Sequence, residues 1–204
     1  MGIWRLTDRR ITVKKNILIV VDMQNDFIDG ALGTSEAKMI VPNVVNKIHS
    51  YIKEDDIILV TRDTHHEDYL FTEEGKNLPV EHCIKGTYGW ELNKDVLDAL
   101  NDGDVLRKQG TLDKPTFGSF ALGLKLKELN EIFDIENIEV IGLCTDICVI
   151  SNAIIAKSVL PNVHIKVDAS CCAGVTPESH NTALDEMRTL QVEIVNRGKE
   201  PWIK

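Results

Sequence analysis

The chain has 204 residues, of which 43% are hydrophobic and 27% charged, and its formal net charge is −9. This composition suits one soluble α/β domain over residues 1–204, and the acidic balance argues against nucleic acid as a partner. No apolar run is long enough to cross a membrane and the charged segment 1–15 lacks the apolar core of a signal peptide, so we expect a cytoplasmic protein.

Short apolar runs alternate with amphipathic segments along the whole chain, which is typical of a parallel sheet with helices between its strands. Strands are expected, in chain order, at residues 16–22, 56–61, 103–107, 138–143, 163–167 and 192–195. Helices are expected at residues 41–53 (with Pro42 in the first turn), 120–130, 147–159 and 178–190. Right-handed crossovers then predict a three-layer α/β/α fold with a six-stranded, mainly parallel sheet.

Four reactive residues each follow an expected strand. Asp22, Asp63, Lys114 and Cys148 come after the first, second, third and fourth strands. Open parallel sheets bind ligands beyond the carboxyl ends of their strands, so we expect these side chains to meet at one edge. The long irregular stretch 62–90 lies at the same edge, and loops of that length in compact domains are usually functional.

Cys148 stands where a buried strand turns into a helix. Thr145 and Asp146 offer side chains for the helix N-cap, which places the thiol in the first helical turn. Unpaired N–H groups and the positive end of the helix dipole favour the thiolate there. A cysteine can also be a small core residue, but the charged neighbours at this edge favour a nucleophile.

Asp22 and Lys114 can complete a nucleophilic site. A carboxylate at the end of an apolar strand loses water, so the pKa of Asp22 should rise towards the range of a general base, although a helix cap or structural ion pair is the alternative. Lys114 alone would be a surface lysine, but beside a carboxylate it would help to ionise Cys148. Such a set attacks an sp2 carbon, and backbone N–H groups receive the oxyanion.

The loop after the second strand holds candidate metal ligands. Asp63 and His65 project to the same side of an extended backbone, and His82 can return from across the loop. One carboxylate and two imidazoles suit Zn, Mn or Fe, while a hydrophilic loop with histidines would look the same. His66 should point away from Asp63 into solvent.

Three motifs together resemble the isochorismatase-like cysteine hydrolases, and within that superfamily the nicotinamidases. They are D-M-Q-N-D-F at 22–27, K-P-T-F-G-S-F at 114–120 and G-L-C-T-D-I-C-V at 142–149. The resemblance covers about residues 17–195 in the family's order and implies the family's six-stranded fold. Isochorismatases proper lack the nucleophilic cysteine, so the presence of Cys148 argues against that branch.

The resemblance also implies a mechanism and its residues. It implies a triad of Asp22, Lys114 and Cys148 that converts nicotinamide to nicotinate through a thioester, with ammonia leaving first. It implies an oxyanion hole from the backbone N–H groups of Cys144 and Cys148, and a cis peptide between Leu143 and Cys144. Self-association into a homo-oligomer and a role in recycling nicotinamide for NAD are further implications.

Nicotinamidases carry D-x-H and P-x-x-H-C segments, which residues 63–65 and 79–83 match. The match implies a divalent metal, with zinc as first candidate, that binds the pyridine nitrogen and orients the amide over the cysteine. Glu74 is a candidate fourth ligand from the same loop. Phe27 matches the aromatic residue that lines the family's substrate pocket.

Two departures from the family concern the substrate. Thr64 stands where many nicotinamidases have tryptophan, and Leu78 stands where many have an aromatic residue against the pyridine ring. Leu78 can cover a ring face but loses the stacking preference. A second hypothesis therefore keeps the triad and changes the substrate to another small amide or a carbamoyl or ureido compound. A third, a non-catalytic binding protein of this fold, would predict a lost triad member.

The other histidines and cysteines have no clear role in the sequence. His49, His164 and His180 have no reactive neighbours, and adjacent Cys171 and Cys172 are expected to be packing residues. Five cysteines in irregular positions do not make a disulfide framework, which indicates a reducing compartment.

Overall fold

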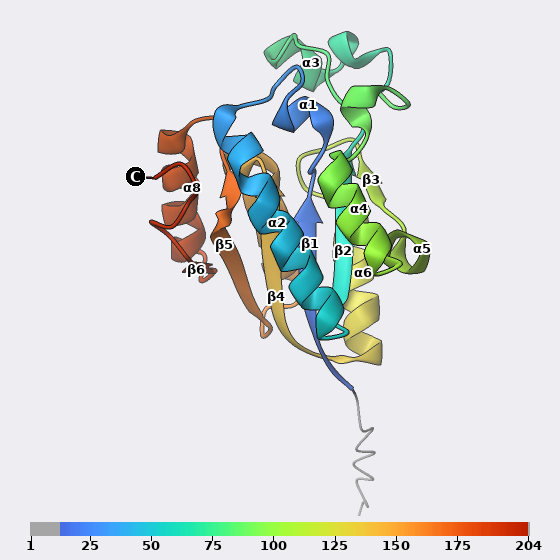
Figure 1. The fold of residues 1–204 in the computed structure, drawn as a ribbon, viewed down its shortest axis with the longest axis vertical. Coiled ribbons are helices and arrows are strands. Elements are labelled where there is room, and N and C mark those ends of the chain that lie inside the picture. The colour runs from blue at the N-terminus through green and yellow to red at the C-terminus, as the bar shows by residue number, and fades with distance from the viewer. Residues whose placement is uncertain (1–12, 204) are drawn as a thin grey trace, which may run out of the picture.

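The computed structural model describes residues 13–203, so the signal-peptide prediction, which depends on residues 1–12, falls outside it. A six-stranded sheet runs through the molecule in the order β3-β2-β1-β4-β5-β6, and every neighbouring pair is parallel. Figure 1 shows α2 and α4 in front of this sheet and α6 behind it. The predicted α/β/α architecture with six strands is therefore confirmed. The strand order reverses between β1 and β4, where sheets of this kind form ligand sites.

The strands are short and mostly buried on both faces. In chain order they are β1 (Lys14–Val21), β2 (Ile57–Asp63), β3 (Leu112–Lys114), β4 (Asp134–Leu143), β5 (His164–Ala173) and β6 (Glu193–Val195). The apolar run 17–21 in β1 is completely buried, as expected for a central strand with helices on both sides.

The helices follow the strands in alternation. They are α1 (Asn25–Ile28), α2 (Ser35–Lys53), α3 (Glu73–Asn77), α4 (Lys94–Asp102), α5 (Val105–Gln109), α6 (Phe120–Ile132), α7 (Ile150–Val159) and α8 (Pro177–Thr189). Short 3₁₀ turns, η1 (Tyr69–Phe71) and η2 (Tyr88–Trp90), flank α3 in the long loop, and a π-helical turn, η3 (Thr145–Val149), precedes α7. Among residues 13–203, no helix has the length and apolar character needed to span a membrane.

The predicted third strand at residues 103–107 is wrong. Asp104 adopts a left-handed backbone conformation, and the apolar residues after it form α5, which buries Val105 against the core. The true third strand is β3, whose three residues pair with the end of β2. A three-residue edge strand is too short to show an alternating pattern, which explains the error.

The start of the second helix also differs from the prediction. It begins at Ser35, where Thr34 caps it by accepting a hydrogen bond from the Ala37 N–H, so Pro42 lies inside the helix instead of in its first turn. Proline removes one helical hydrogen bond and leaves the carbonyl of residue 38 without its helical donor. Both Pro42 and Lys38 are exposed, so the break lies on the outer face of the helix.

A charged cluster lies buried between α2 and the sheet. Lys47 Nζ lies 2.7 Å from Glu139 Oε1 and 2.8 Å from Asp168 Oδ2, and the Tyr51 hydroxyl donates to Glu139 at 2.8 Å. Burial opposes the charge on Lys47, but hydrogen bonds to Asp168 and Glu139 outweigh it and raise the Lys47 pKa above its usual range. The ammonium therefore neutralises two carboxylates that have almost no access to water.

Lys47→Met should lower the free energy of unfolding by about 3 kcal/mol, because Asp168 loses the ammonium beside it and Glu139 is left with the more distant Lys166 ammonium, at 3.4 Å. Urea unfolding followed by circular dichroism measures the change. Lys14→Met is the matched control, since the Lys14–Glu136 pair is exposed and should contribute about 0–1 kcal/mol. Equal losses for the two variants would contradict a stabilising role for the buried cluster.

Candidate active site

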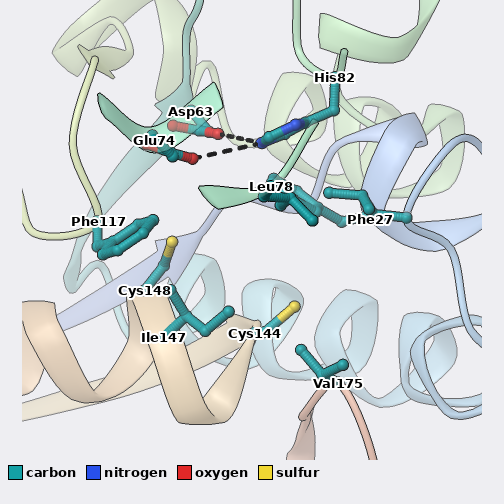
Figure 2. Close-up of a pocket in the computed structure, with 11 residues that line it drawn as sticks. Phe27, Asp63, Glu74, Leu78, His82, Phe117, Cys144, Ile147, Cys148 and Val175 are labelled. Atoms are coloured by element: carbon teal, nitrogen blue, oxygen red, sulfur yellow. Dashed lines mark ion pairs between the residues drawn. The ribbon is translucent and has the colours of Figure 1, made fainter. Parts of the chain in front are cut away.

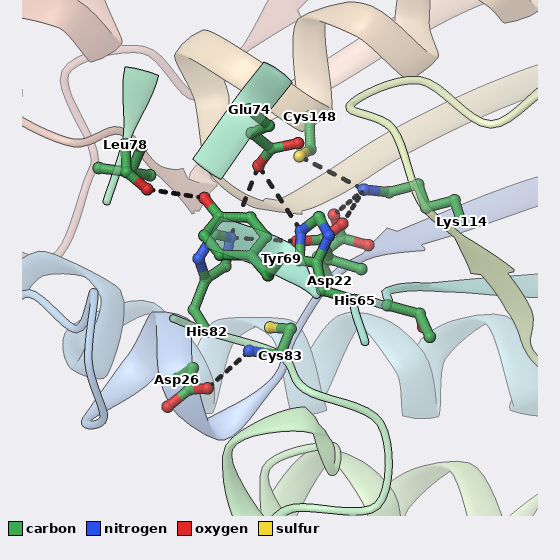
Figure 3. Close-up of polar contacts among 12 residues, drawn as sticks. Asp22, Asp26, His65, Tyr69, Glu74, Leu78, His82, Cys83, Lys114 and Cys148 are labelled. Carbon is green, nitrogen blue, oxygen red and sulfur yellow. Dashed lines mark hydrogen bonds and ion pairs between the residues drawn. The ribbon is translucent and has the colours of Figure 1, made fainter. Parts of the chain in front are cut away.

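The carboxyl ends of the first four strands bring the predicted reactive residues together. Asp22 directly follows β1, Asp63 ends β2, Lys114 ends β3 and Cys148 lies in η3 after β4. Figure 3 shows the side chains of Asp22, Lys114 and Cys148 converging on one region. All four are buried, so their charges interact with little screening by water.

Gly142 allows the two central strands to approach at this edge. It pairs with Val21 of β1 and has φ of +117°, a conformation that favours glycine. A Cβ atom at this position would lie 2.1 Å from the Val21 carbonyl oxygen. The glycine in the G-L-C-T-D motif therefore lets the turn that carries Cys148 sit beside the residue that follows Val21, which is Asp22.

Lys114 connects the acid and the thiol. Its Nζ lies 2.6 Å from Asp22 Oδ2, 3.4 Å from Cys148 Sγ and 3.6 Å from Asp63 Oδ1. Burial lowers the Lys114 pKa, but Asp22 and the other acidic neighbours outweigh burial and raise it above the usual range. The group at the centre of the cluster is therefore an ammonium.

Asp22 is fully buried and held by two neighbours. Its Oδ1 accepts a hydrogen bond of 2.7 Å from the Thr61 hydroxyl, and its Oδ2 faces Lys114. Burial raises the Asp22 pKa above its ordinary value, although Lys114 opposes this effect. The predicted upward shift towards a general base is confirmed in direction.

The turn around Cys148 differs from the predicted helix start. Thr145 and Asp146 do not cap a helix: the Thr145 hydroxyl contacts His180 Nδ1 at 2.7 Å, and Asp146 accepts a hydrogen bond from the Val175 N–H at 3.2 Å. The regular helix α7 begins only at Ile150. Cys148 therefore lies in the π-helical turn that links β4 to α7. A π-helical turn has no distinctive sequence pattern, which explains the error.

The environment of Cys148 opposes the thiolate that the sequence position was expected to favour. Burial, followed by the charge of Asp22, raises the Cys148 pKa well above its usual range, and the opposing effect of Lys114 is smaller. The Cys148 residue is only 4% exposed, so its side chain has lost most of its contact with water. This direction favours the thiol in the resting site, so a proton must leave as the sulfur attacks.

The peptide between Leu143 and Cys144 is cis, as the resemblance implies. The side chains of Cys144 and Cys148 both line the same pocket, which Figure 2 shows. The backbone of this turn therefore borders the space in which a substrate carbonyl would lie. The oxyanion hole at the N–H groups of Cys144 and Cys148 stays a prediction.

Four side chains form a compact cluster of candidate metal ligands: Asp63, His65, Glu74 and His82, whose ligand atoms all lie within 4.8 Å of one another. His65 Nε2 is 3.0 Å from Asp63 Oδ2 and 3.6 Å from Glu74 Oε1, and His82 Nε2 is 3.4 and 3.7 Å from the same two oxygens. The structure thus groups the three predicted ligands with the candidate fourth, Glu74. His66 is exposed, as predicted.

The four histidine–carboxylate distances in the cluster are compatible with a tetrahedral cation site. Ligand atoms at about 2.0–2.1 Å from a zinc ion would be spaced by roughly 3.3–3.4 Å, close to the distances observed here. His82 Nδ1 contacts the Val80 carbonyl oxygen at 2.8 Å, so this bond directs Nε2 towards the cluster. The residues present therefore fit a divalent metal.

The D-M-Q-N-D-F motif at residues 22–27 contains Asp22 and also holds the loop of candidate metal ligands in place. Gln24 makes two hydrogen bonds with the backbone of Asp63, at 2.7 and 2.8 Å. Asp26 accepts a hydrogen bond of 2.7 Å from the Cys83 N–H, next to His82, as Figure 3 shows. Sequence reasoning did not assign these roles, although both residues lie in the D-M-Q-N-D-F motif.

An apolar pocket of about 210 Å³ separates the cysteine from the metal-ligand cluster. Its lining consists of Phe27, Leu32, Asp63, Glu74, Leu78, His82, Phe117, Cys144, Ile147, Cys148 and Val175. Figure 2 shows the ion-pair contacts of His82 on one side and the two sulfurs on the other. Phe27 and Leu78 were expected here, and the Tyr69 hydroxyl fixes Leu78 by donating to its carbonyl oxygen at 2.9 Å.

Phe117 is a pocket residue that the sequence prediction missed. It lies three positions after Lys114, within the K-P-T-F-G-S-F motif, and that position was the available signal. Thr64 is buried but does not line the pocket, and its hydroxyl accepts a hydrogen bond of 2.9 Å from Trp90 Nε1. Thr64, which stands where many nicotinamidases have tryptophan, therefore does not contribute to the pocket lining.

Comparison with known proteins gives consistent results. The model of the isochorismatase domain matches residues 16–198. A Bacillus subtilis (strain 168) protein named "Uncharacterized isochorismatase family protein PncA" is 31% identical over 176 residues, which cover 83% of this chain and 92% of that protein.

Solved structures agree. The crystal structure of nicotinamidase/pyrazinamidase PncA from Bacillus subtilis has a TM-score of 0.76 at 29% identity, covering 88% of this chain and 98% of that one. The pyrazinamidase of Pyrococcus horikoshii, solved in complex with zinc, has a TM-score of 0.71 at 26% identity, covering 89% and 98%. By its domain match, sequence and fold, this chain belongs to the isochorismatase family.

Proposed function

We propose that the protein hydrolyses nicotinamide to nicotinate and ammonia through a thioester on Cys148. One observation supports this most: the pocket has a thiol with its Lys114–Asp22 pair on one side and a metal-ligand cluster on the other. The protein is a hydrolase of amide C–N bonds, as its nicotinamidase and pyrazinamidase neighbours indicate. The choice of nicotinamide is the proposed part.

The triad can move protons in a closed cycle. As the Cys148 sulfur attacks the amide carbon, Asp22 accepts the thiol proton, and Lys114 keeps both groups in place. The oxyanion forms at the turn, where the backbone N–H groups of Cys144 and Cys148 are the proposed donors. Asp22 then gives its proton to the leaving nitrogen, and ammonia departs.

Water completes the reaction at the thioester. Asp22 takes a proton from the attacking water, and the carbon–sulfur bond breaks to release nicotinate. The leaving Cys148 sulfur takes the proton back from Asp22. The raised pKa of Asp22 suits a group that must accept and donate a proton in each half of the cycle.

The side of the pocket that carries the candidate metal ligands would recognise the pyridine ring of nicotinamide. Asp63, His65, Glu74 and His82 would hold a divalent cation, zinc first, which supplies a Lewis-acid contact for the ring nitrogen. Phe27 and Phe117 are aromatic walls of the pocket, and they can pack against a planar ring.

The alternative substrate class keeps the triad and replaces the pyridine amide by another small amide or a carbamoyl or ureido compound. Thr64 and Leu78, which depart from the nicotinamidase pattern, motivate this alternative. An N-carbamoyl amino acid carries a carboxylate, and no lysine or arginine lines the pocket among the residues that the structure describes. The apolar lining therefore favours the neutral aromatic amide.

A panel of amides tests the substrate. The zinc-loaded protein should release ammonia fastest from nicotinamide, and benzamide should be about 100-fold slower because it lacks the ring nitrogen that a polar site would bind. Ammonia is measured for nicotinamide, pyrazinamide, benzamide and N-carbamoylglycine. Preference for N-carbamoylglycine would favour the alternative, and no ammonia from any compound would favour a binding protein.

We also propose that residues 1–204 form a single domain that works in the cytoplasm as a homo-oligomer. The family match over residues 16–198 supports one domain. In this setting the nicotinate produced would return to pyridine nucleotide synthesis.

A further inference from the structure

A buried line of three polar side chains lies behind the turn that carries the cysteine. Thr145 comes from η3, His180 from α8, and Glu200 from the segment after β6. The Thr145 hydroxyl is 2.7 Å from His180 Nδ1, and His180 Nε2 is 3.5 Å from Glu200 Oε1. All three residues are at most 2% exposed. The sequence prediction that His180 has no reactive neighbours is therefore wrong.

The carboxylate of Glu200, at the end of this line, lacks hydrogen bonds in the described part of the chain. His180 Nε2 and both carboxylate oxygens of Glu200 lack a hydrogen-bond partner of good geometry within residues 13–203. Trp202 packs edge-on against the His180 ring, with centroids 5.4 Å apart. Burying a carboxylate without full hydrogen bonding costs free energy. Stability of the fold alone does not explain why Glu200 stands here.

We propose that His180 and Glu200 are positioning residues that hold the Cys144–Cys148 turn in its reactive geometry, an inference that rests on the proposed function. Glu200 Oε1 lies 3.5 Å from Nε2, and its negative charge favours the ring proton on that nitrogen. Nδ1 is then free to accept a hydrogen bond from the Thr145 hydroxyl. Thr145 adjoins Cys144, so this bond fixes the orientation of the peptide groups that face the substrate.

The electrostatics of the cluster agree with a neutral ring. Burial lowers the His180 pKa below its usual value, and the nearby Glu200 opposes this effect only in part. Asp146 and Arg197 are the other charged groups that influence His180. A neutral imidazole with its proton on Nε2 presents the acceptor that Thr145 needs.

Substitutions at Glu200 separate positioning from stability. Glu200→Leu has similar volume but no acceptor, so it should reduce kcat for nicotinamide about tenfold, with KM within about twofold. Its free energy of unfolding should stay equal or increase, because an unsatisfied buried carboxylate is removed. A residue with a purely structural role would not lose activity while keeping or gaining stability.

Conservative variants provide the rescue. Glu200→Gln keeps an acceptor for His180 and Thr145→Ser keeps the hydroxyl, so both should retain most of kcat, whereas Thr145→Val should match the loss in Glu200→Leu. His49→Ala is the control, because His49 also pairs with a carboxylate, Asp102 at 3.3 Å, but on the exposed surface. Its kcat should equal that of the wild type.

A measurement without an amide substrate distinguishes the two proposals. The rate of alkylation of Cys148 by iodoacetamide, followed by mass spectrometry, should fall severalfold in Glu200→Leu and Thr145→Val, because the sulfur loses its place beside Lys114, and stay near wild type in Glu200→Gln. If the wild type releases no ammonia from the amide panel, the proposed function fails while this readout still tests positioning. Folded Glu200→Leu and Thr145→Val proteins with wild-type kcat and alkylation rates would overturn the inference.

Discussion

Cys148→Ala should abolish the release of ammonia from nicotinamide, with a loss of kcat of at least about 10⁴-fold. The sulfur is the atom that forms the thioester, so no acyl-enzyme can form without it. Cys144 lines the same pocket, but Lys114 Nζ lies 3.4 Å from the sulfur of Cys148, so the Lys114–Asp22 pair serves Cys148. The assay is ammonia production by the zinc-loaded protein.

Cys171→Ala is the matched control for this variant. Cys171 is buried in β5 and does not line the pocket, so its loss should leave kcat unchanged. Acid quenching of the wild type during turnover should reveal by mass spectrometry a chain that carries one nicotinoyl group, and Cys148→Ala should show none. Ammonia release within tenfold of wild type in Cys148→Ala would exclude this cysteine as the nucleophile.

The sheet edge that holds the site could be predicted because β1, β2 and β4 contain apolar runs that end close to a reactive residue. The expected strand at 16–22 lies within two residues of both ends of β1, and the expected strand at 138–143 ends where β4 ends, although β4 begins at Asp134. In a parallel sheet the strand ends share one edge, so Asp22 and Cys148 are neighbours once the topology is known. Lys114 was expected to follow a third strand at residues 103–107, but it ends the three-residue strand β3, so its edge was right although its strand was wrong.

The electrostatic state of the cysteine could not be predicted from the local sequence. A helix start favours the thiolate, but the Cys148 pKa rises because tertiary packing removes water and places Asp22 nearby. The same reason applies to His180, whose partners are 35 residues before it, at Thr145, and 20 residues after it, at Glu200. Contacts of this kind depend on how α8 and the C-terminal segment pack against the turn.

His65→Ala should remove the bound divalent metal and reduce kcat/KM for nicotinamide by about 100-fold. The imidazole of His65 contacts both carboxylates of the cluster, at 3.0 Å from Asp63 and 3.6 Å from Glu74, so its loss takes one of four ligands from the site. Elemental analysis of the purified protein should fall from about one metal per chain to nearly none. Chelation of the wild type should have the same effect on activity, reversed by added zinc.

His66→Ala is the sharpest control, because it removes the same side chain one position along the chain. His66 is exposed and is not one of the clustered ligands, so its variant should keep both metal and activity. Alkylation of Cys148 should continue in His65→Ala, since Lys114 and Asp22, which contact each other at 2.6 Å, do not depend on that imidazole. A His65→Ala protein that retains its metal would contradict the role of His65 as a ligand. One that loses the metal at unchanged kcat/KM would separate the cluster from substrate recognition and leave the pocket's apolar walls as the source of specificity.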